Sequence, residues 1–321
     1  MLEKKGESAY NKLESERAYP FFVKKVLICG VDNIEGVSGM FRIVEKKALN
    51  PSMTKMVVEA PFVAHKAQAG QFIILRVNEH GERIPLTVAD YDREKGTVTI
   101  IFQKVGKTTM LLDQLNENDA ILDFIGPLGK ASELEGYHKV AVIGGGAGCA
   151  IAYPQAKALH QMGIPVDVIA GFRNIDLVIL EEEMNQVSNN LTVMTDDGSN
   201  GNKGFVTDAL RKNIEAGAGY DLVIAIGPIP MMKAVSQLTK EYNIKTIVSM
   251  NPIMIDGTGM CGGCRLTVGG KTKFACVDGP DFDGHEVDFD EAMERLRTYK
   301  KDEEREAREE NCRLMRGAEH A

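Results

Sequence analysis

The hydrophobic positions of this chain follow two different patterns, and the change between them falls near residue 138. Before it, short apolar runs are separated by turns rich in Pro, Gly and Asn. Runs of this length and spacing are typical of short antiparallel strands and predict a small β-barrel over residues 40–137. The expected strands are Phe41–Val44, Thr54–Ala60, Gln71–Val77 and Thr97–Gln103, followed by a short helix over Thr108–Leu115.

After residue 138 the apolar runs are unbroken, as in strands that are covered on both faces. Lys139–Ile143 leads directly into five residues, Gly144 to Gly148, and a helix is expected from Ala150 to Met162. A strand, a glycine turn and a helix in this order predict a Rossmann-like parallel α/β nucleotide domain over residues 138–248. Its further strands are expected at Pro165–Gly171, Leu191–Thr195 and Asp221–Ile226.

The glycine turn is the candidate for binding the phosphates of a nucleotide. Glycine lets the backbone approach a pyrophosphate closely, and the dipole of the following helix favours the negative charge. The candidate residues are Gly144, Gly145, Gly146 and Gly148.

Four residues near the C-terminus have the spacing of metal ligands. Asp256, Cys261, Cys264 and Cys276 form the pattern D-x4-C-x2-C-x11-C. Plant-type [2Fe–2S] sites have the spacing C-x4-C-x2-C followed by a distant Cys, so Asp256 occupies the first ligand position. The glycines at 257, 259, 262 and 263 allow the backbone to curl around a cluster, and a hairpin turned at Gly269-Gly270 would return Cys276 to the loop.

Two alternatives to this assignment stay open. A C-x2-C pair also binds zinc, although a zinc site normally needs a second pair or a nearby His. Asp256 could instead only cap its loop, with the fourth ligand elsewhere. The other thiols, Cys29, Cys149 and Cys312, have no ligand spacing and are expected to be buried small hydrophobes or exposed bystanders.

Composition narrows the functional classes. The 321 residues are 44% hydrophobic and carry a net charge of −8, which argues against a nucleic-acid partner. We expect no membrane span, since no apolar run approaches the required length. Six cysteines in a chain of this length do not form a disulfide framework, so a cytoplasmic protein with reduced thiols is expected.

We therefore expect a multidomain β plus α/β protein in five stretches. They are a flexible N-terminal extension (1–39), an antiparallel β-barrel (40–137), a parallel α/β nucleotide domain (138–248), a small C-terminal [2Fe–2S] domain (249–288) and a charged, solvated C-terminal helix (289–321).

Two loops of the barrel resemble the FAD-binding domain of the ferredoxin reductase superfamily. The first is Arg83–Thr87, and the second is Gly106–Thr109, which opens a helix. An Arg can bind a pyrophosphate with two hydrogen bonds, and a helix N-terminus attracts anions. The resemblance implies that FAD is contacted by Arg83, Pro85, Leu86, Thr87, Ile101, Phe102, Gln103, Thr108 and Thr109.

The nucleotide domain carries a second resemblance to the same superfamily. Gly227-Pro-Ile-Pro-Met-Met232 looks like the loop that lies near the nicotinamide in ferredoxin reductase-like enzymes. Thr195–Ser199, together with Lys203–Asp208, is similar to the electron-transfer subunit of dihydroorotate dehydrogenase; the alternative for these two runs is a polar turn followed by a helix cap. The resemblance implies NAD contacts at Gly227, Pro228, Met231, Asp197 and Arg173 beside the glycine turn. Arg173 could meet a 2′-phosphate, whereas Glu181–Glu183 would repel one, and NAD(H) is favoured from the family.

The domain order and Asp256 resemble the small subunit of NADH-dependent reduced ferredoxin:NADP oxidoreductase (Nfn type). This implies hydride exchange between NAD(H) and FAD and single-electron transfer through a [2Fe–2S] cluster to a larger glutamate synthase-like flavo-iron–sulfur subunit, which serves ferredoxin indirectly and bifurcates electrons. The side chains would bind and orient cofactors, so no acid–base catalytic residue is expected. The alternatives are the electron-transfer subunit of an NAD-dependent dihydroorotate dehydrogenase and a zinc-stabilised binding protein without catalysis.

Overall fold

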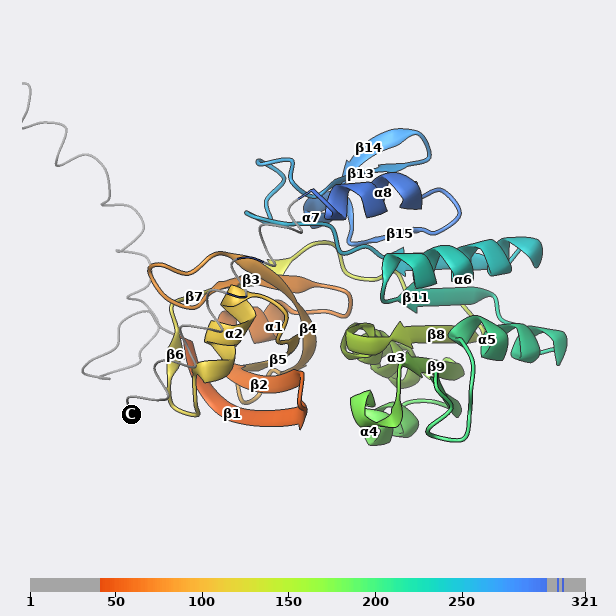
Figure 1. Cartoon of the computed structure of the whole chain (residues 1–321), viewed down its shortest axis with the longest axis horizontal. Coiled ribbons are helices and arrows are strands. Elements are labelled where there is room, and N and C mark those ends of the chain that lie inside the picture. Colours follow the sequence, from red (N-terminus) through yellow and green to blue (C-terminus); the bar gives the residue numbers. More distant parts are fainter. Residues whose placement is uncertain (1–40, 299–304, 306–307, 309–321) are drawn as a thin grey trace, which may run out of the picture. The chain divides into compact units, whose positions relative to one another are not determined.

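The computed structural model describes residues 41–298 together with 305 and 308 (Figure 1). These residues belong to one compact unit that begins at Met40. The expected N-terminal extension, Cys29, Cys312 and nearly all of the C-terminal helix beyond residue 298 lie outside the described residues. Among the described residues, no helix is both long and apolar enough to cross a bilayer.

The first part of the described chain is an antiparallel sheet of seven strands in the order β6-β1-β2-β5-β4-β3-β7. Its edge strands β6 and β7 are separated in sequence by Leu122 alone, so the sheet must curl until its two edges nearly meet. The predicted antiparallel barrel is therefore confirmed. Its elements are β1 Phe41–Asn50, β2 Met53–Glu59, α1 Pro61–Lys66, β3 Phe72–Arg76, β4 Ile84–Asp92, β5 Thr97–Gln103, α2 Lys107–Gln114, β6 Ala120–Ile121 and β7 Asp123–Leu128.

One segment of the barrel differs from its sequence interpretation. Arg83–Thr87 was expected to be a loop, but β4 begins at Ile84. Pro85 pairs with Ile74 of β3, while the pairing of β4 with β5 begins only at Val88. Proline lacks an N–H, so it fits in a strand where only one side of the ladder is formed.

The second part is a mainly parallel sheet in the order β10-β9-β8-β11-β12-β15, which confirms the α/β prediction. Alternate residues of its strands enter two separate cores. One core includes residues of α5 and α6, and the other includes residues of α3 and α4. The elements are β8 Val140–Gly145, the 3-10 turn η1 Gly146–Gly148, α3 Cys149–Gln161, β9 Val166–Phe172, η2 Ile175–Leu177, α4 Glu181–Gln186, β10 Asn190–Thr195, α5 Val206–Glu215, β11 Leu222–Ile226, α6 Ile229–Glu241 and β12 Lys245–Ser249.

The cysteine-rich segment, which contains Cys261, Cys264 and Cys276, is attached to this sheet by strand pairing. Its strand β15, Asp281–Asp283, pairs antiparallel with β12, and β12 itself runs through the expected boundary between residues 248 and 249. The predicted hairpin is present: β13 Arg265–Val268 pairs with β14 Lys271–Phe274. Gly269 and Gly270 both have positive φ, at 56° and 72°, as a two-residue hairpin turn of the primed type requires.

Two helices complete the segment. Helix α7, Ala275–Asp278, follows the hairpin and contains Cys276. Helix α8, Phe289–Leu296, is capped by Asp288, which accepts a hydrogen bond from the N–H of Glu291 at 3.0 Å. The expectation of a purely solvated helix is wrong for α8, because Phe289 and Ala292 are buried in the core shared with α5 and α6.

Candidate functional site

The nucleotide candidates lie at the point where the strand order of the parallel sheet reverses. From β8 the chain proceeds to β9 and β10 on one side, and then returns to β11 on the other side of β8. Gly144 of β8 pairs with Ile226 of β11, so the two following loops leave the sheet side by side. Ligands of open α/β sheets bind at such switch points, outside the carboxyl ends of the strands.

The two loops at this edge approach each other too closely for side chains. A Cβ on Gly148 would lie 2.3 Å from the carbonyl oxygen of Ile226, and one on Gly145 would lie 2.4 Å from Sδ of Met231. Gly146 differs, because a Cβ there would meet nothing within 4 Å, although its φ is 54°. Packing therefore explains Gly145 and Gly148, whereas Gly146 faces open space where a ligand can approach.

The structure places Gly227, Pro228 and Met231 opposite the glycine turn, at the start of α6. A Cβ on Gly227 would lie 2.9 Å from Cε of Met231 and 3.1 Å from the backbone of Gly145. These residues, expected from the resemblance to meet the nicotinamide, thus share one edge with the glycine turn. Gly144 and Gly145 belong to β8 itself, not to the turn.

Arg173 and Asp197 follow neighbouring strands of the same edge. Both are exposed, and the N–H of Asp197 donates to the carbonyl oxygen of Arg173 at 3.3 Å. Hydrogen bonds from Ser199 to the Asp197 carboxylate lower the pKa of Asp197. The backbones of an acidic and a basic residue thus lie side by side at the outer end of the edge.

Phe205 is a candidate contact that the sequence interpretation missed. Its side chain is 65% exposed at the start of α5, and its N–H donates to Asp208 at 2.8 Å. The next residue, Val206, packs over Gly171, where a Cβ would lie 2.5 Å from it. The exposed ring of Phe205 is thereby fixed next to the carboxyl end of β9. In the sequence, the signal for this contact was an apolar residue within a polar loop.

The flavin candidates of the second loop form the N-terminus of α2. Thr109 Oγ1 accepts the N–H groups of Val105 at 3.1 Å and Gly106 at 3.0 Å, which fixes the entry to the helix. Thr108 is buried. The first turn of a helix leaves N–H groups outside its own ladder, and a Cβ on Gly106 would meet nothing within 4 Å. This open, positive helix end fits a phosphate, whereas the Thr109 hydroxyl already serves as a cap.

The remaining flavin candidates lie on the adjacent strands β4 and β5. Pro85, Leu86 and Thr87 are half-buried on β4, and Arg83 is exposed just before it. On β5, Gln103 is exposed, and Ile101 packs against the core of the nucleotide domain. Phe102 is 2% exposed inside the barrel core, so only its backbone is available to a ligand.

Two of the four cluster candidates are brought together. Cys264 and Cys276 are buried with their sulfurs 3.2 Å apart, and neither is in a disulfide. Burial, and then the hydrogen bond from Cys264, raise the pKa of the Cys276 thiol to about 12. Metal binding must displace protons from such thiols. Gly257, Gly259 and Gly262 have positive φ, as the expected curl of the loop requires.

Asp256 and Cys261 are held by the loop itself. The Asp256 carboxylate accepts the N–H of Thr258 at 2.8 Å and that of Cys261 at 2.9 Å, and these backbone hydrogen bonds lower its pKa. Cys261 is exposed, and its sulfur accepts the N–H of Gly263 at 3.4 Å. Within the described residues, no three acidic, His or Cys side chains form a ready-made metal site. The thiol-rich donor set still fits an iron–sulfur cluster, and each Asp256 oxygen keeps a lone pair for a metal.

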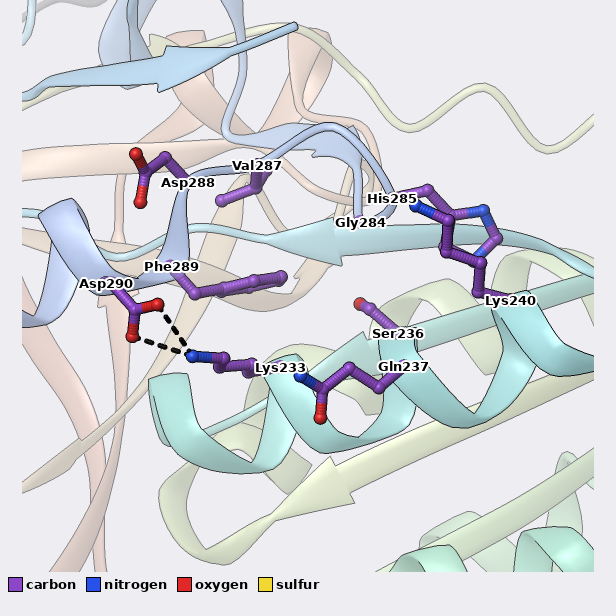
Figure 2. Close-up of a pocket in the computed structure, with 10 residues that line it drawn as sticks. All are labelled: Lys233, Ser236, Gln237, Lys240, Gly284, His285, Val287, Asp288, Phe289 and Asp290. Atoms are coloured by element: carbon purple, nitrogen blue, oxygen red, sulfur yellow. Dashed lines mark hydrogen bonds and ion pairs between the residues drawn. The ribbon is translucent and has the colours of Figure 1, made fainter.

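Two hollows lie near the cysteine-rich segment. One, of about 220 Å³, is an open groove between α6 and residues 284–290, and Figure 2 shows the ion pair of Lys233 with Asp290 at its wall. The other, of about 330 Å³, lies beside the cysteine loop and includes Cys261, Arg265 and Arg295 in its wall. Arg265 and Arg295 donate to the carbonyl oxygens of Gly262 and Gly263, at 3.3 and 3.2 Å, so they brace this loop.

The remaining thiol of the nucleotide domain plays no part in these sites. Cys149 is fully buried at the start of α3, and burial raises the pKa of its thiol to about 12. It is the small buried hydrophobe that the sequence predicted.

Three family models match successive parts of the chain. Residues 40–132 match an oxidoreductase FAD-binding domain, residues 142–237 an oxidoreductase NAD-binding domain, and residues 251–288 the iron–sulfur cluster binding domain of dihydroorotate dehydrogenase B. The fold and these domains define an oxidoreductase of the ferredoxin reductase type, with FAD, NAD and iron–sulfur cluster binding domains.

Similar proteins identify the family more closely. A Thermotoga maritima homologue of the electron transfer subunit of dihydroorotate dehydrogenase B is 46% identical over 268 residues, which is 84% of this chain and 94% of the relative. A Clostridium beijerinckii protein, described as uncharacterized in the adh 3′ region, is 55% identical over 272 residues, or 82% and 92% of the two chains. This chain belongs to the family of these electron transfer subunits and their homologues.

A solved structure extends the likeness to three dimensions. It is a chain of an NADH-dependent reduced ferredoxin-NADP oxidoreductase, reported for its insight into flavin-based electron bifurcation. The sequences are 43% identical and the TM-score is 0.80, with 86% of this chain and 99% of that chain covered.

Proposed function

We propose that this chain is the electron-transfer subunit of a ferredoxin:NADP oxidoreductase. It exchanges hydride between NAD(H) and FAD and passes single electrons through a [2Fe–2S] cluster to a larger glutamate synthase-like flavoprotein. The observation that carries this proposal is the joining of three sites on one chain. The segment after Cys276 is bonded to both other domains: Lys130 N–H donates to the carbonyl oxygen of Gly279 at 2.7 Å, and β15 pairs with β12 of the nucleotide domain.

The residues would bind and orient cofactors. A bound flavin exchanges electrons in pairs with nicotinamide and singly with a cluster. Gly146 and the start of α3 would receive the nucleotide pyrophosphate, with Pro228 and Met231 beside the nicotinamide. The start of α2 would receive a phosphate of FAD, with Arg83 nearby and Thr87 on β4. The metal ligands would be Cys261, Cys264, Cys276 and Asp256. Asp256 would keep its hydrogen bonds to the N–H groups of Thr258 and Cys261 while it binds the metal.

The outer end of the nucleotide edge favours NAD(H) over NADP(H). Asp197 follows β10, and a carboxylate there repels a 2′-phosphate. The exposed ring of Phe205 offers a stacking surface for the adenine. Arg173 supports the opposite preference. Kinetics with both nucleotides test the choice: Asp197→Asn should improve the use of NADPH relative to NADH if the carboxylate decides it.

A second candidate is the electron-transfer subunit of an NAD-dependent dihydroorotate dehydrogenase. It is favoured by the family model matched at residues 251–288. Asp256 argues for the first candidate, because the resemblance to the Nfn-type small subunit includes an acidic residue in the first ligand position.

The partner decides between the two candidates. The protein would be purified anaerobically from its native source, and co-purifying chains would be identified by mass spectrometry. We expect a glutamate synthase-like flavoprotein and a complex that reduces NADP with NADH and reduced ferredoxin. Co-purification with a dihydroorotate-oxidising subunit would move the assignment to pyrimidine synthesis.

The cofactor content of the chain provides an independent check. We expect one FAD and two irons per chain, with bleaching of the flavin on addition of NADH. Stoichiometric zinc without flavin would refute the electron-transfer assignment. Asp256→Cys should retain the two irons and shift the cluster's EPR spectrum if Asp256 is a ligand, and Asp256→Ala should lower the iron content.

A further inference from the structure

Three segments of the chain meet at the carboxyl group of Asp281, the first residue of β15. Its Oδ2 accepts a hydrogen bond from Ser132 Oγ at 2.6 Å and lies 3.4 Å from Nε2 of Gln155. In the β12–β15 ladder Asp281 stands opposite Ser249. The residue as a whole is half-buried, but Oδ1 of its carboxyl group is sealed from solvent.

Each of these contacts comes from a different part of the molecule. Ser132 lies between the barrel and β8, and its N–H donates to Ala69 of the barrel at 2.9 Å. Gln155 is a fully buried residue of α3 in the nucleotide domain. Asp281 itself comes five residues after Cys276, in the stretch that leaves the cysteine loop. One carboxyl group therefore connects the barrel, the nucleotide domain and the cysteine-rich segment.

The fit around Ser132 is tight. A Cβ on Gly70 would lie 2.1 Å from Oγ of Ser132, so the barrel must present a glycine at this point. Gly70 has a φ of 84°, which glycine adopts without strain. The Ser132 hydroxyl that donates to Asp281 is thus closely packed against the barrel backbone at Gly70, so it has little freedom to move.

The hydrogen bonding of this group is incomplete. Oδ1 of Asp281 and Oε1 of Gln155 are both buried without a hydrogen-bond partner. Buried polar atoms are normally paired, and a proton on the carboxyl group would convert one orphan acceptor into a donor. Burial raises the pKa of Asp281, while Ser132 and Ser249 act in the opposite direction.

We propose that Asp281 is a positioning residue for electron transfer, which holds the segment behind Cys276 against the barrel and α3 and thereby fixes the cluster relative to the flavin. This inference rests on the proposed function, because it assumes that electrons pass from flavin to cluster. A polar contact is suited to this role since its geometry is directional, whereas apolar packing permits sliding. The two unpaired buried acceptors, Oδ1 of Asp281 and Oε1 of Gln155, favour a neutral, hydrogen-bonding form of the carboxyl group.

The test separates the two electron-transfer steps in the full-length chain with FAD and cluster bound. NADH delivers two electrons to the flavin, and the cluster accepts one of them. Stopped-flow absorbance follows flavin reduction, and freeze-quench EPR follows cluster reduction. Asp281→Ala should slow cluster reduction about tenfold, a typical size for the loss of a residue that couples two sites, with flavin reduction unchanged.

Asp281→Asn tests the neutral form. An amide matches the shape of a protonated carboxyl group and can both donate and accept, so this variant should transfer electrons at nearly the wild-type rate. Asp290→Ala is the matched control, because it also removes a carboxylate that bonds the nucleotide domain, to Lys233 at 2.7 Å, but on an exposed surface (Figure 2). It should leave both rates unchanged.

Cluster reduction at the wild-type rate in Asp281→Ala would overturn the inference, and so would equal slowing in Asp290→Ala. If Asp281→Ala loses its cluster, Ser132→Ala decides, since it removes the donor without altering the cysteine-rich segment. It should slow cluster reduction with normal iron content and flavin reduction; an unchanged rate would refute the inference. Failure of the wild type to reduce its cluster with NADH would instead refute the proposed function.

Discussion

Two candidate sites are formed in different ways: the nucleotide edge, where the turn Gly146–Gly148 faces Gly227-Pro228, and the cysteine loop, residues 256–264. At the nucleotide edge, parallel strands bring Gly146 and Pro228 together through sheet topology, and the close packing of Gly148 on Ile226 leaves no room for adjustment. The cysteine loop is irregular, and of the three candidate thiols only Cys264 of the loop and Cys276 of α7 adjoin.

The difference shows which site depends on its ligand. The nucleotide edge is held by the backbone pairing of β8 with β11. The cysteine loop has few regular hydrogen bonds, and its exposed Cys261 would have to move toward the other proposed ligands to share a metal with them. Binding free energy of a metal is then also folding free energy for the loop.

The largest effect is expected for Cys264→Ala. Removal of this buried thiol, a proposed ligand, should abolish the cluster, so that iron content and the cluster's EPR signal fall to background. FAD content and flavin reduction by NADH should persist, because the nucleotide edge does not depend on the cluster. Cys149→Ala, which removes an equally buried thiol from α3, is the control and should retain its iron. Loss of flavin reduction in Cys264→Ala would contradict the independence of the two sites.

At the nucleotide edge, Gly148→Ala should be the more damaging of two glycine substitutions. The new Cβ would meet the backbone of Ile226 at 2.3 Å, and overpacking of this kind costs about 1–3 kcal/mol. Gly146→Ala meets open space and carries only the strain of its positive φ, about 1 kcal/mol. Denaturant unfolding measures both costs. The KM for NADH should rise in both variants, and a larger loss of stability in Gly146→Ala would show that packing does not govern this edge.

The sequence predicts the nucleotide edge better than the barrel strand β4. The unbroken run before Gly144 and the turn at Gly227-Pro228 identify the strands and the switch-point loops, because buried parallel strands have a distinctive pattern. The sequence interpretation expected a loop over Arg83–Thr87, where the structure has the start of β4. The structure explains the difference by one-sided pairing, which depends on neighbours distant in sequence.

The cysteine segment shows the same limit. The spacing of Asp256 and the three cysteines, and the Gly269-Gly270 turn, are local signals and are legible in the sequence. The return of β15 to the sheet and the burial of Phe289 are not, since both depend on contacts with β12 and α6. The contacts of Asp281 with Ser132 and Gln155 could likewise not be predicted, because both partners lie more than a hundred residues away in the sequence.

A pH titration of stability should distinguish Asp281 from an ordinary surface carboxylate. Because burial raises its pKa, the folded state holds the proton at pH values where the unfolded state, with a pKa of about 3.9, has lost it. The folded state then binds more protons, so this group's contribution to stability is full below about pH 3.9 and falls as pH rises through the folded pKa. The groups that bond the carboxyl, Ser132, Ser249 and Gln155, do not titrate.

Asp281→Asn removes this titration. The unfolding free energy of the variant minus that of the wild type should therefore increase as the pH rises from about 3.9 to the folded pKa, as measured by denaturant unfolding. Asp290→Asn provides the comparison, since its carboxylate is exposed. A difference between Asp281→Asn and wild type that stays constant with pH would show that the carboxyl is ionised throughout this range.

The smallest effects are expected at two ion pairs of the described residues that connect the nucleotide domain to its neighbours. In the first pair, Lys157 of α3 binds Asp90 of β4 at 2.7 Å, and both side chains are about one-third exposed. In the second pair, Lys233 of α6 binds Asp290 of α8 at the same distance (Figure 2). The Asp290 side chain is 74% exposed. Exposed pairs contribute about 0–1 kcal/mol.

Asp90→Asn should therefore cost more stability than Asp290→Asn, and both costs should shrink at high salt because screening weakens exposed pairs most. Asp90 also lies where the barrel meets α3, so its loss should slow flavin reduction by NADH, while loss of Asp290 should not. Double-mutant cycles with Lys157→Met and Lys233→Met isolate each pair from the other effects of the substitutions. An equal coupling energy for the two pairs would mean that burial does not distinguish them, and that the barrel is held to the nucleotide domain by apolar contacts such as those of Ile101.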